Sequence, residues 1–232
     1  MKDTLRSLIE AGREREVEVL VPRVLDPAVL ADKWTTKDVL AHLSAWRSIA
    51  AEELEAIRTG GDGPEVVDEI DVKNAEIYDA TRDLPADTVL AEGERSWDAL
   101  LAVLDACTED DLQRMRMRRP DQEAWQMIPG NTYFHIAQHL DWWHSERGED
   151  ADAEDAAKWA HGLAIEAFPE DRRRGVAEYN LGCYYASHGR AAEALPLLQR
   201  GFELFPPLVE LARTDIDLDP IRETPRIAEL LA

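Results

Sequence analysis

The sequence predicts an all-α protein. Apolar residues recur at spacings of three and four through most of the chain, and glycine and proline fall between these periodic segments. No long alternating run of β-branched residues indicates a strand. With 232 residues, the chain is long enough for one large domain or for two modest ones with separate cores.

The first two helices have clear boundaries in the sequence. The first is predicted over roughly residues 3–20, where charged and apolar residues alternate at helical spacing before a proline. The second begins after Thr35, with Asp38 three residues on as a variant capping box, and ends at the glycine pair 60–61. We expect its apolar stripe to be the seam of a helix bundle: Val39, Leu43, Trp46, Ala50, Leu54 and Ile57.

Three more helices are expected before residue 147. They lie around 67–82, at 86–106 and near 132–146, with an irregular segment at 110–130 between the last two. The helix at 86–106 should turn inward Leu90, Trp97, Leu101 and Leu104. The last helix should bury Ile136, Leu140 and Trp143. Asn131 is expected to cap that helix, with a substrate contact as the alternative.

The irregular segment carries a basic cluster within DLQRMRMRRPD, which is unusual in so acidic a chain. The cluster consists of Arg114, Arg116, Arg118 and Arg119. Two interpretations stay open at this point: a solvated loop, or a clamp for an acidic group.

The run ERGEDADAEDAA crowds like charges and small residues together. We interpret it as a boundary, which is either an open linker or the acidic start of a helix. The predicted division is therefore a bundle over residues 1–147, an acidic boundary at 148–154 and a second helical region over 155–232.

The second region contains AEYNLGCYYASHGRAAEALPLLQRGFELFP, which resembles the tetratricopeptide repeat. Six residues match the offsets of the repeat: Leu181, Gly182, Tyr185, Gly189, Ala194 and Pro206. Glu178 stands where the repeat usually has a tryptophan. The resemblance implies a short TPR-like helical array that contacts a protein partner or mediates self-association. Tyr185 should be buried in it, and Tyr184 should be available on the adjoining face.

The charge of the chain excludes several classes of partner. A net charge of −22 argues against nucleic acid and against an anionic membrane surface, because an acidic surface repels phosphates. The start of the chain lacks the apolar run of a signal peptide, and no stretch approaches the ~20 apolar residues of a membrane span. We therefore expect a cytoplasmic protein. Cys107 and Cys183 should then be buried thiols and not a disulfide.

Three histidines form the pattern that most suggests chemistry. His135 and His139 are four residues apart, so both imidazoles project from one face of their helix. His42 lies one turn before Trp46, at the rim of its own seam. If the two helices pack seam to seam, three imidazoles could meet and hold a divalent ion with open positions for water or substrate. The alternative is a hydrogen-bonded histidine pair and an unrelated third histidine. The sequence has no HExxH motif, so a metalloprotease mechanism has no support.

Three stretches together resemble the ClbS/DfsB branch of the DinB/YfiT-like superfamily: WTTKDVLAHLSAW, NAEIYDATRDLPADTVLAEGERSWDALLAVLDA and PGNTYFHIAQHLDWW. They cover about residues 1–146 in the order and spacing of that family. The resemblance implies a DinB-like four-helix bundle. It also implies a metal site, because metal-binding members use one histidine of the second helix and an HxxxH pair of the last. The matching residues are His42, His135 and His139.

These inferences predict a metal-dependent small-molecule enzyme, either a hydrolase or a thiol-dependent transferase. The resemblance implies protection against a reactive metabolite, and the expected cofactor is a divalent ion, zinc or nickel. We expect a substrate-binding wall of aromatic residues formed by Trp46, Tyr78, Tyr133 and Trp142, with Trp34 and Trp143 as further candidates. The alternative for each of these aromatic residues is simple core packing. The alternative for the function is a non-catalytic protein whose bundle sequesters a ligand and whose tail binds a protein.

Overall fold

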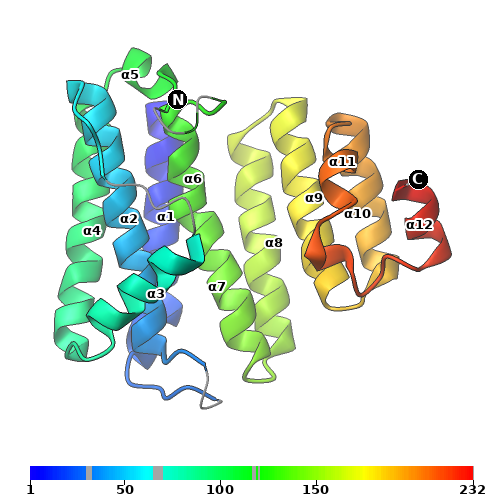
Figure 1. Cartoon of the computed structure of the whole chain (residues 1–232), viewed down its shortest axis with the longest axis horizontal. Coiled ribbons are helices and arrows are strands. Elements are labelled where there is room, and N and C mark those ends of the chain that lie inside the picture. Colours follow the sequence, from blue (N-terminus) through cyan, green and yellow to red (C-terminus); the bar gives the residue numbers. More distant parts are fainter. Residues whose placement is uncertain (30–32, 65–69, 117–118, 120, 232) are drawn as a thin grey trace. The chain divides into compact units, whose positions relative to one another are not determined.

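The computed structural model of the chain describes residues 1–29, 33–64, 70–116, 119 and 121–231. Within these ranges every regular element is a helix, so the fold is all-α, as the sequence predicts (Figure 1). The chain divides into two compact units, Met1–Arg147 and Gly148–Ala232, which are described separately below. None of the helices in the described ranges combines the length and the hydropathy that a membrane span requires.

The first unit is a four-helix bundle. Its long helices are α1 (Lys2–Val19), α2 (Thr36–Thr59), α4 (Ala86–Ala106) and α7 (Tyr133–Ser145). They close a ring, because α1 packs on α4 and α7, and α2 packs on the same two helices. The shorter α3 (Ile70–Thr81) packs on α2 and crosses the long helices in Figure 1. Residues 67–69, where this helix was predicted to begin, lie outside the described residues.

The boundaries of α2 are those that the sequence predicts. Thr35 accepts a hydrogen bond from the backbone N–H of Asp38, and the Asp38 carboxylate accepts one from the Thr35 N–H in return. The helix ends at Gly60, whose φ of +77° lies in the left-handed region that favours glycine. The predicted seam is buried except at Trp46, which is half-buried, and the next residue, Arg47, is fully buried instead.

Arg47 is the least expected member of the bundle core, with an exposed fraction of 0%. Its guanidinium donates to both carboxylate oxygens of Glu16 on α1, at 3.1 and 3.2 Å, and to Oγ of Ser96 on α4, at 2.9 Å. The Trp97 ring lies 3.6 Å from the guanidinium carbon, and its indole N–H donates to Glu16 at 2.9 Å. Each buried charge therefore has partners, and the network joins α1, α2 and α4 at one level.

The inward face of α4 differs from the prediction by one residue. Trp97 and Leu104 are buried as expected, but Leu90 and Leu101 are only half-buried. Their core positions are taken by the preceding residues, Val89 and Leu100. The difference arises because α4 packs on both α1 and α2, so its buried face is wider than a single stripe and is rotated to suit two neighbours.

The start of α7 is held close to α1. A Cβ on Gly12 of α1 would lie 3.2 Å from the backbone nitrogen of Tyr133 and 3.0 Å from the Trp97 ring, so only glycine fits this contact without a shift of its neighbours. Beyond this contact the predicted apolar residues of α7 are buried: Ile136, Leu140 and Trp143. His135 and His139, which precede Ile136 and Leu140 by one residue each, face His42 on α2.

The segment 110–130, predicted to be irregular, is partly helical. The short helices of this unit are η1 (Val21–Arg23), α5 (Glu109–Gln113), η2 (Ala124–Gln126) and α6 (Met127–Asn131). Between α5 and η2 the chain doubles back, and an antiparallel bridge pairs Met115 with Glu123. Asn131 does not cap α7 as expected, because it ends α6 and its side-chain amide donates to the Met127 carbonyl at 2.8 Å. Arg118 lies outside the described residues.

The second unit contains α8 (Asp150–Ala167), α9 (Asp171–Ser187), α10 (Ala191–Leu204), α11 (Leu208–Ala212), η3 (Ile216–Leu218) and α12 (Pro225–Leu231). The acidic run is thus the start of α8. Helix α9 packs on both α8 and α10, and α10 also contacts α12. At Gly182 of α9 a Cβ would lie 2.9 Å from Cδ2 of Leu198 on α10, so this glycine permits a close helix contact.

The core of the second unit corrects one expectation. Tyr185 is buried as predicted, but Tyr184 is equally buried, at 7% exposure, and does not offer a free recognition surface. Its ring packs against the rings of Tyr185 and His188, at 5.3 and 4.4 Å between centroids. Both cysteines are buried free thiols, as predicted. Burial raises the pKa of Cys107 to about 11 and raises that of Cys183 further, so both stay protonated at neutral pH.

Candidate metal centre

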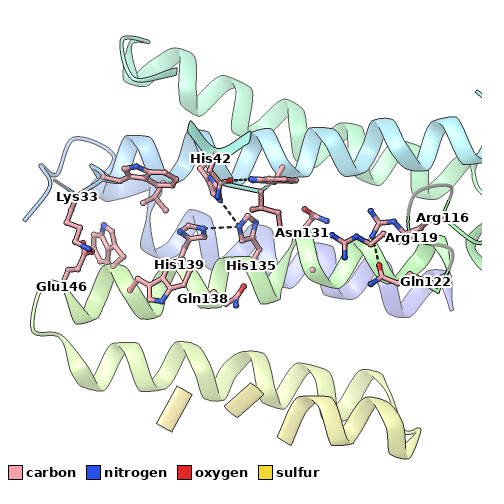
Figure 2. Close-up of a pocket in the computed structure, with 18 residues that line it drawn as sticks. Lys33, His42, Arg116, Arg119, Gln122, Asn131, His135, Gln138, His139 and Glu146 are labelled. Carbon is pink, nitrogen blue, oxygen red and sulfur yellow. Dashed lines mark hydrogen bonds and ion pairs between the residues drawn. The ribbon is translucent and has the colours of Figure 1, made fainter. Parts of the chain in front are cut away.

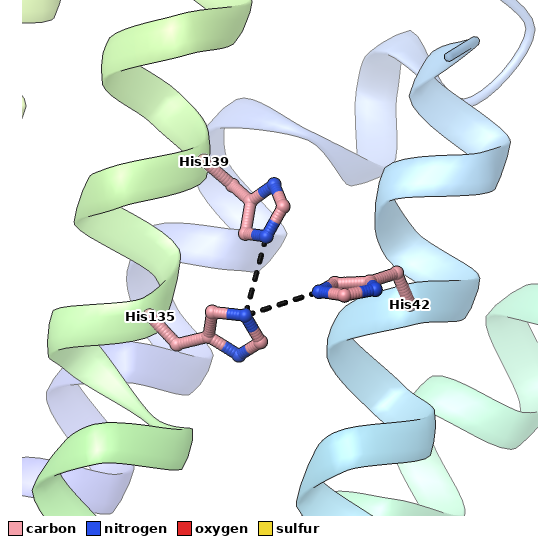
Figure 3. A group of neighbouring side chains, drawn as sticks. All are labelled: His42, His135 and His139. Atoms are coloured by element: carbon pink, nitrogen blue, oxygen red, sulfur yellow. Dashed lines mark hydrogen bonds between the residues drawn. The ribbon is translucent and has the colours of Figure 1, made fainter. Parts of the chain in front are cut away.

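Three histidine side chains meet between α2 and α7 (Figure 3). His42 comes from α2, and His135 and His139 come from successive turns of α7. The Nε2 atom of His135 lies 3.1 Å from Nε2 of His42 and 3.2 Å from Nε2 of His139. One nitrogen of each ring lies within 4.8 Å of the other two. The structure therefore brings together the three residues that the sequence singled out.

These separations match what a small divalent ion requires of its ligands. Two nitrogens that are each ~2.0–2.1 Å from an ion are ~2.9–3.4 Å apart when the angle between them is ~90–110°. The two measured separations, 3.1 and 3.2 Å, fall inside this range. Three imidazoles on one side of an ion also leave its other positions open. The residues present thus fit a divalent ion.

The protonation state of the three rings also suits a metal. Burial lowers the pKa of His42 to about 4. Burial, together with positive charge on His42 and Arg47, lowers the pKa of His135 to about 3. The pKa of His139 is also well below its usual value, chiefly through burial and then through the two other histidines. All three rings are therefore neutral at neutral pH, with lone pairs that can bind an ion.

In two of the three histidines, the second ring nitrogen lacks, within the described residues, the hydrogen bond that usually orients a metal ligand. The Nδ1 atoms of His42 and His135 are buried, and no group in the described part of the chain hydrogen-bonds to them. In metal sites, a carboxylate or carbonyl commonly accepts a hydrogen bond from this nitrogen and orients the ring. Tryptophan rings pack against two members of the histidine cluster, His42 and His139. Trp34 lies 4.9 Å from His42, and Trp142 lies edge-on to His139 at 5.1 Å.

A cavity of about 710 Å³ opens over the histidines, and its lining comes from several elements of the first unit (Figure 2). Helix α2 contributes Trp46, whose indole N–H donates to the Asn74 side chain on α3 at 2.9 Å. Helix α7 contributes Gln138 and the half-exposed Trp142. The cavity thus combines aromatic side chains with many polar and charged groups, so it can contact both the apolar and the polar parts of a small molecule.

Two of the four expected aromatic substrate-binding residues line this cavity, and two do not. Trp46 and Trp142 line it. Tyr133 is a correction, because it faces the bundle core at 4% exposure, on the same side of α7 as Ile136. Tyr78 is also a correction, because it stands behind Trp34, with the two rings stacked at 6.0 Å, and does not reach the cavity.

Sequence reasoning missed several residues that line the cavity. Gln138 lies three residues after His135 on the same helix face, so helical spacing could have identified it. Lys33, Ile70 and Asn74 reach the cavity from the segment before α2 and from α3. No spacing within those segments indicates a site, because only their packing against α2 and α7 brings them there.

Another group of potential ligands lies in the second unit, where Cys183, Asp215 and Asp217 are close together. The Tyr179 hydroxyl donates to the Asp215 carboxylate at 2.7 Å, and the Cys183 sulfur lies 3.8 Å from the same oxygen. The pKa of the Cys183 thiol is raised by burial and by Asp215, whereas a metal ligand must be a thiolate. This group is therefore better explained as a hydrogen-bonded contact between α9 and η3.

Comparison with known proteins gives one match. A family model described as the DinB superfamily matches residues 16–141, a segment that contains all three histidines. Neither the curated proteins nor the solved structures contain a match to the chain.

Proposed function

This chain belongs to the DinB superfamily, and from that premise we propose that its first unit is a metal-dependent small-molecule enzyme. His42, His135 and His139 would hold the divalent ion, zinc or nickel. The observation that carries the proposal is the convergence of three neutral imidazoles, with Nε2 separations of 3.1 and 3.2 Å, beneath a cavity of about 710 Å³.

When bound, such an ion supplies a Lewis acid that lowers the pKa of a bound water or thiol and so generates a nucleophile. The residues of the chain would do the rest. Trp46 and Trp142 would bind the apolar part of the substrate, and Gln138 would orient a polar group. The reaction that fits is attack of water or of a thiol cosubstrate on an electrophile. Resemblance to the ClbS/DfsB branch favours hydrolysis of a reactive metabolite.

Elemental analysis of purified protein tests the metal site directly. We expect about one zinc or nickel ion per chain in the wild type and less than about a tenth of that in His135→Ala, because two imidazoles alone bind an ion weakly. His161→Gln is a matched control, since His161 lies in the second unit and pairs with Glu178 at 3.3 Å. Wild-type protein that stays metal-free after incubation with both ions would contradict the proposal, as would equal metal in His135→Ala.

One observation favours a second candidate, a non-catalytic protein that sequesters a ligand. Among the described residues that line the cavity, Glu146 is the one carboxylate, and it is paired with Lys33 at 3.5 Å. The described lining thus offers no unpaired carboxylate that could act as a general base. Steady-state assays with activated esters, with and without added thiol, separate the two. Turnover that is lost in His135→Ala supports the enzyme, and tight binding without turnover supports the binder.

For the second unit we propose a TPR-like role in self-association or in contact with a protein partner. Its support is the α9–α10 pair, in which Gly182 packs against Leu198 as small residues do in repeat hairpins. Light scattering of the full chain and of residues 1–147 tests self-association. A multimer that only the full chain forms supports the proposal. A monomeric full chain that also captures no protein partner would leave the unit without this role.

A further inference from the structure

The cavity has a second polar end that the proposed function does not use. Figure 2 shows Arg116 and Arg119 at one end of the pocket, with the Lys33–Glu146 pair at the other end and the histidines between them. The chain as a whole has 26 basic and 48 acidic residues. The described lining of the cavity reverses this balance, because it contains three cationic side chains and one carboxylate.

Arg116 is held in place by its neighbours. Its guanidinium donates to both carboxylate oxygens of Glu53 on α2, at 2.8 and 2.7 Å, and to the side-chain oxygen of Gln122 at 2.9 Å. Its backbone N–H donates to the Gln122 carbonyl at 2.8 Å. The loop is thus tied to α2 by a two-pronged ion pair, which fixes geometry as well as charge. Because Glu53 neutralises the charge of Arg116, the main role of Arg116 is to hold the position of Arg119 and Gln122.

Arg119 carries the charge that remains. It is exposed and lines the cavity, and its backbone carbonyl accepts a hydrogen bond from the Gln122 N–H at 2.9 Å. No carboxylate in the described part of the chain pairs with its guanidinium, although acidic residues are nearly twice as numerous as basic ones. Lys33 at the other end is neutralised by Glu146. Among the described residues that line the cavity, Arg119 therefore carries the one positive charge without a paired carboxylate, and it lies at the arginine end.

We propose that Arg119, framed by Arg116 and Gln122, binds the oxyanion of a small-molecule acid, either a carboxylate or a phosphate. A guanidinium presents paired N–H donors that match both groups. The reactive part of that acid would lie at the histidines, a placement that rests on the proposed function. Anion binding at Arg119 does not depend on that function. The same loop was compatible, from sequence, with either a solvated segment or a clamp for an acid, and the cavity favours the clamp.

Calorimetric titration of the full chain with three probes tests this. The probes are 4-phenylbutyrate, phenyl phosphate and the neutral 4-phenylbutanamide. We expect the wild type to bind at least one acid about tenfold or more tightly than the amide, and Arg119→Gln to lose that preference, since a hydrogen bond to a charged group contributes about tenfold or more in affinity. The acid that binds better identifies the oxyanion. Arg95→Gln on α4 is the matched control, because it removes the same charge from an exposed site outside the cavity.

Two further measurements separate this proposal from the metal site. Acid binding is repeated in His135→Ala, where the preference for the acid should persist if Arg119 causes it. Metal content is measured in Arg119→Gln, where it should equal that of the wild type. The proposal is overturned if the wild type binds no acid or shows no preference. It is also overturned if the preference survives in Arg119→Gln, and its loss in His135→Ala would then show that the acid binds at the histidines.

Discussion

His42 and His135 show how single residues can be adapted to a site at a cost to the fold. His42 is buried and His135 is half-buried, both rings are uncharged, and each has a buried Nδ1 atom that has no partner in the described residues. A buried polar atom without a hydrogen bond costs about 1–3 kcal/mol. A residue that only stabilised the bundle would not need an imidazole at these positions. The two rings are therefore better explained by ligand binding than by packing.

The lowered histidine pKa values predict how the metal-free protein responds to acid. In an unfolded chain a histidine has a pKa of ~6.5, whereas the folded values are about 4 for His42 and about 3 for His135. Below pH ~6.5 the unfolded chain binds protons that the folded chain does not, so the free energy of unfolding falls as the pH drops toward 4.

Urea unfolding of chelator-treated protein between pH 4.5 and 7.5 checks this prediction. Carboxylates contribute to the same slope, so the informative quantity is the difference between variants. We expect His135→Gln to show a weaker loss of stability on acidification than the wild type, and His161→Gln to match the wild type. Parallel curves for all three proteins would show that the buried histidines are not the cause.

The burial of Arg47 could not be predicted from its own position in the sequence. An arginine one residue after a tryptophan is expected at a helix surface, because arginine is rarely buried without a partner. Its partner, Glu16, belongs to another helix, and both are buried only because they meet. The histidines were easier to predict, since two of them share a helix face at a fixed spacing.

At the scale of elements, close helix contacts depend on particular glycines. Gly182 and Gly162 both lie inside helices but in opposite surroundings. A Cβ at Gly182 would lie 2.9 Å from Leu198, whereas one at Gly162 would meet nothing within 4 Å. The first glycine is therefore needed for packing, and the second only lowers helix propensity.

This contrast predicts opposite effects of the same substitution. Gly182→Ala should destabilise the second unit by about 1–3 kcal/mol, because the methyl group overpacks the α9–α10 contact. Gly162→Ala should stabilise the protein by about 0.5–1 kcal/mol, because alanine reduces the entropy that helix formation costs. Thermal unfolding measures both. Equal effects of the two substitutions would mean that the close contact does not restrict residue 182.

Most helix boundaries could be predicted from the sequence near each helix end. Which face of a helix is buried could not be predicted in the same way. The capping box at Thr35 and the glycine after Thr59 fix the ends of α2 by hydrogen bonds within a few residues. The inward face of α4 was one residue off, since it depends on where α1 and α2 lie. The same reason explains Tyr133, which is aromatic and next to the site but faces the core.

At the scale of the whole molecule, each unit has an apolar core of its own. The buried cluster of the second unit runs from Ala153 to Leu231 and includes no residue of the bundle. The three histidines and the described lining of the cavity all belong to the first unit. The metal site should therefore not require the second unit.

A fragment of residues 1–147 tests this independence. We expect it to unfold cooperatively and to bind the same number of zinc or nickel ions per chain as the full protein, because its core and its histidines are complete. Circular dichroism and elemental analysis give the two readouts. A fragment that is folded but metal-free would show that the second unit contributes to the site. The sequence identified the three histidines, but it left the arginine cluster open between a solvated loop and a clamp for an acid, because the contacts of the cluster depend on the pairing of Met115 with Glu123.

The ion pair between Arg116 and Glu53 has a consequence for the size of the substrate. Glu53 follows His42 by eleven residues on α2, which is ~16 Å along the helix axis and only ~20° more than three full turns. Helix α2 therefore carries both His42 and Glu53, the partner of Arg116, on the same side. The length of helix between them fixes the distance between the histidines and the arginine end. Since a helix of this kind does not stretch, an acid that binds at both ends would have to match this spacing. An acid too short to span it would reach the arginine or the histidines, but not both.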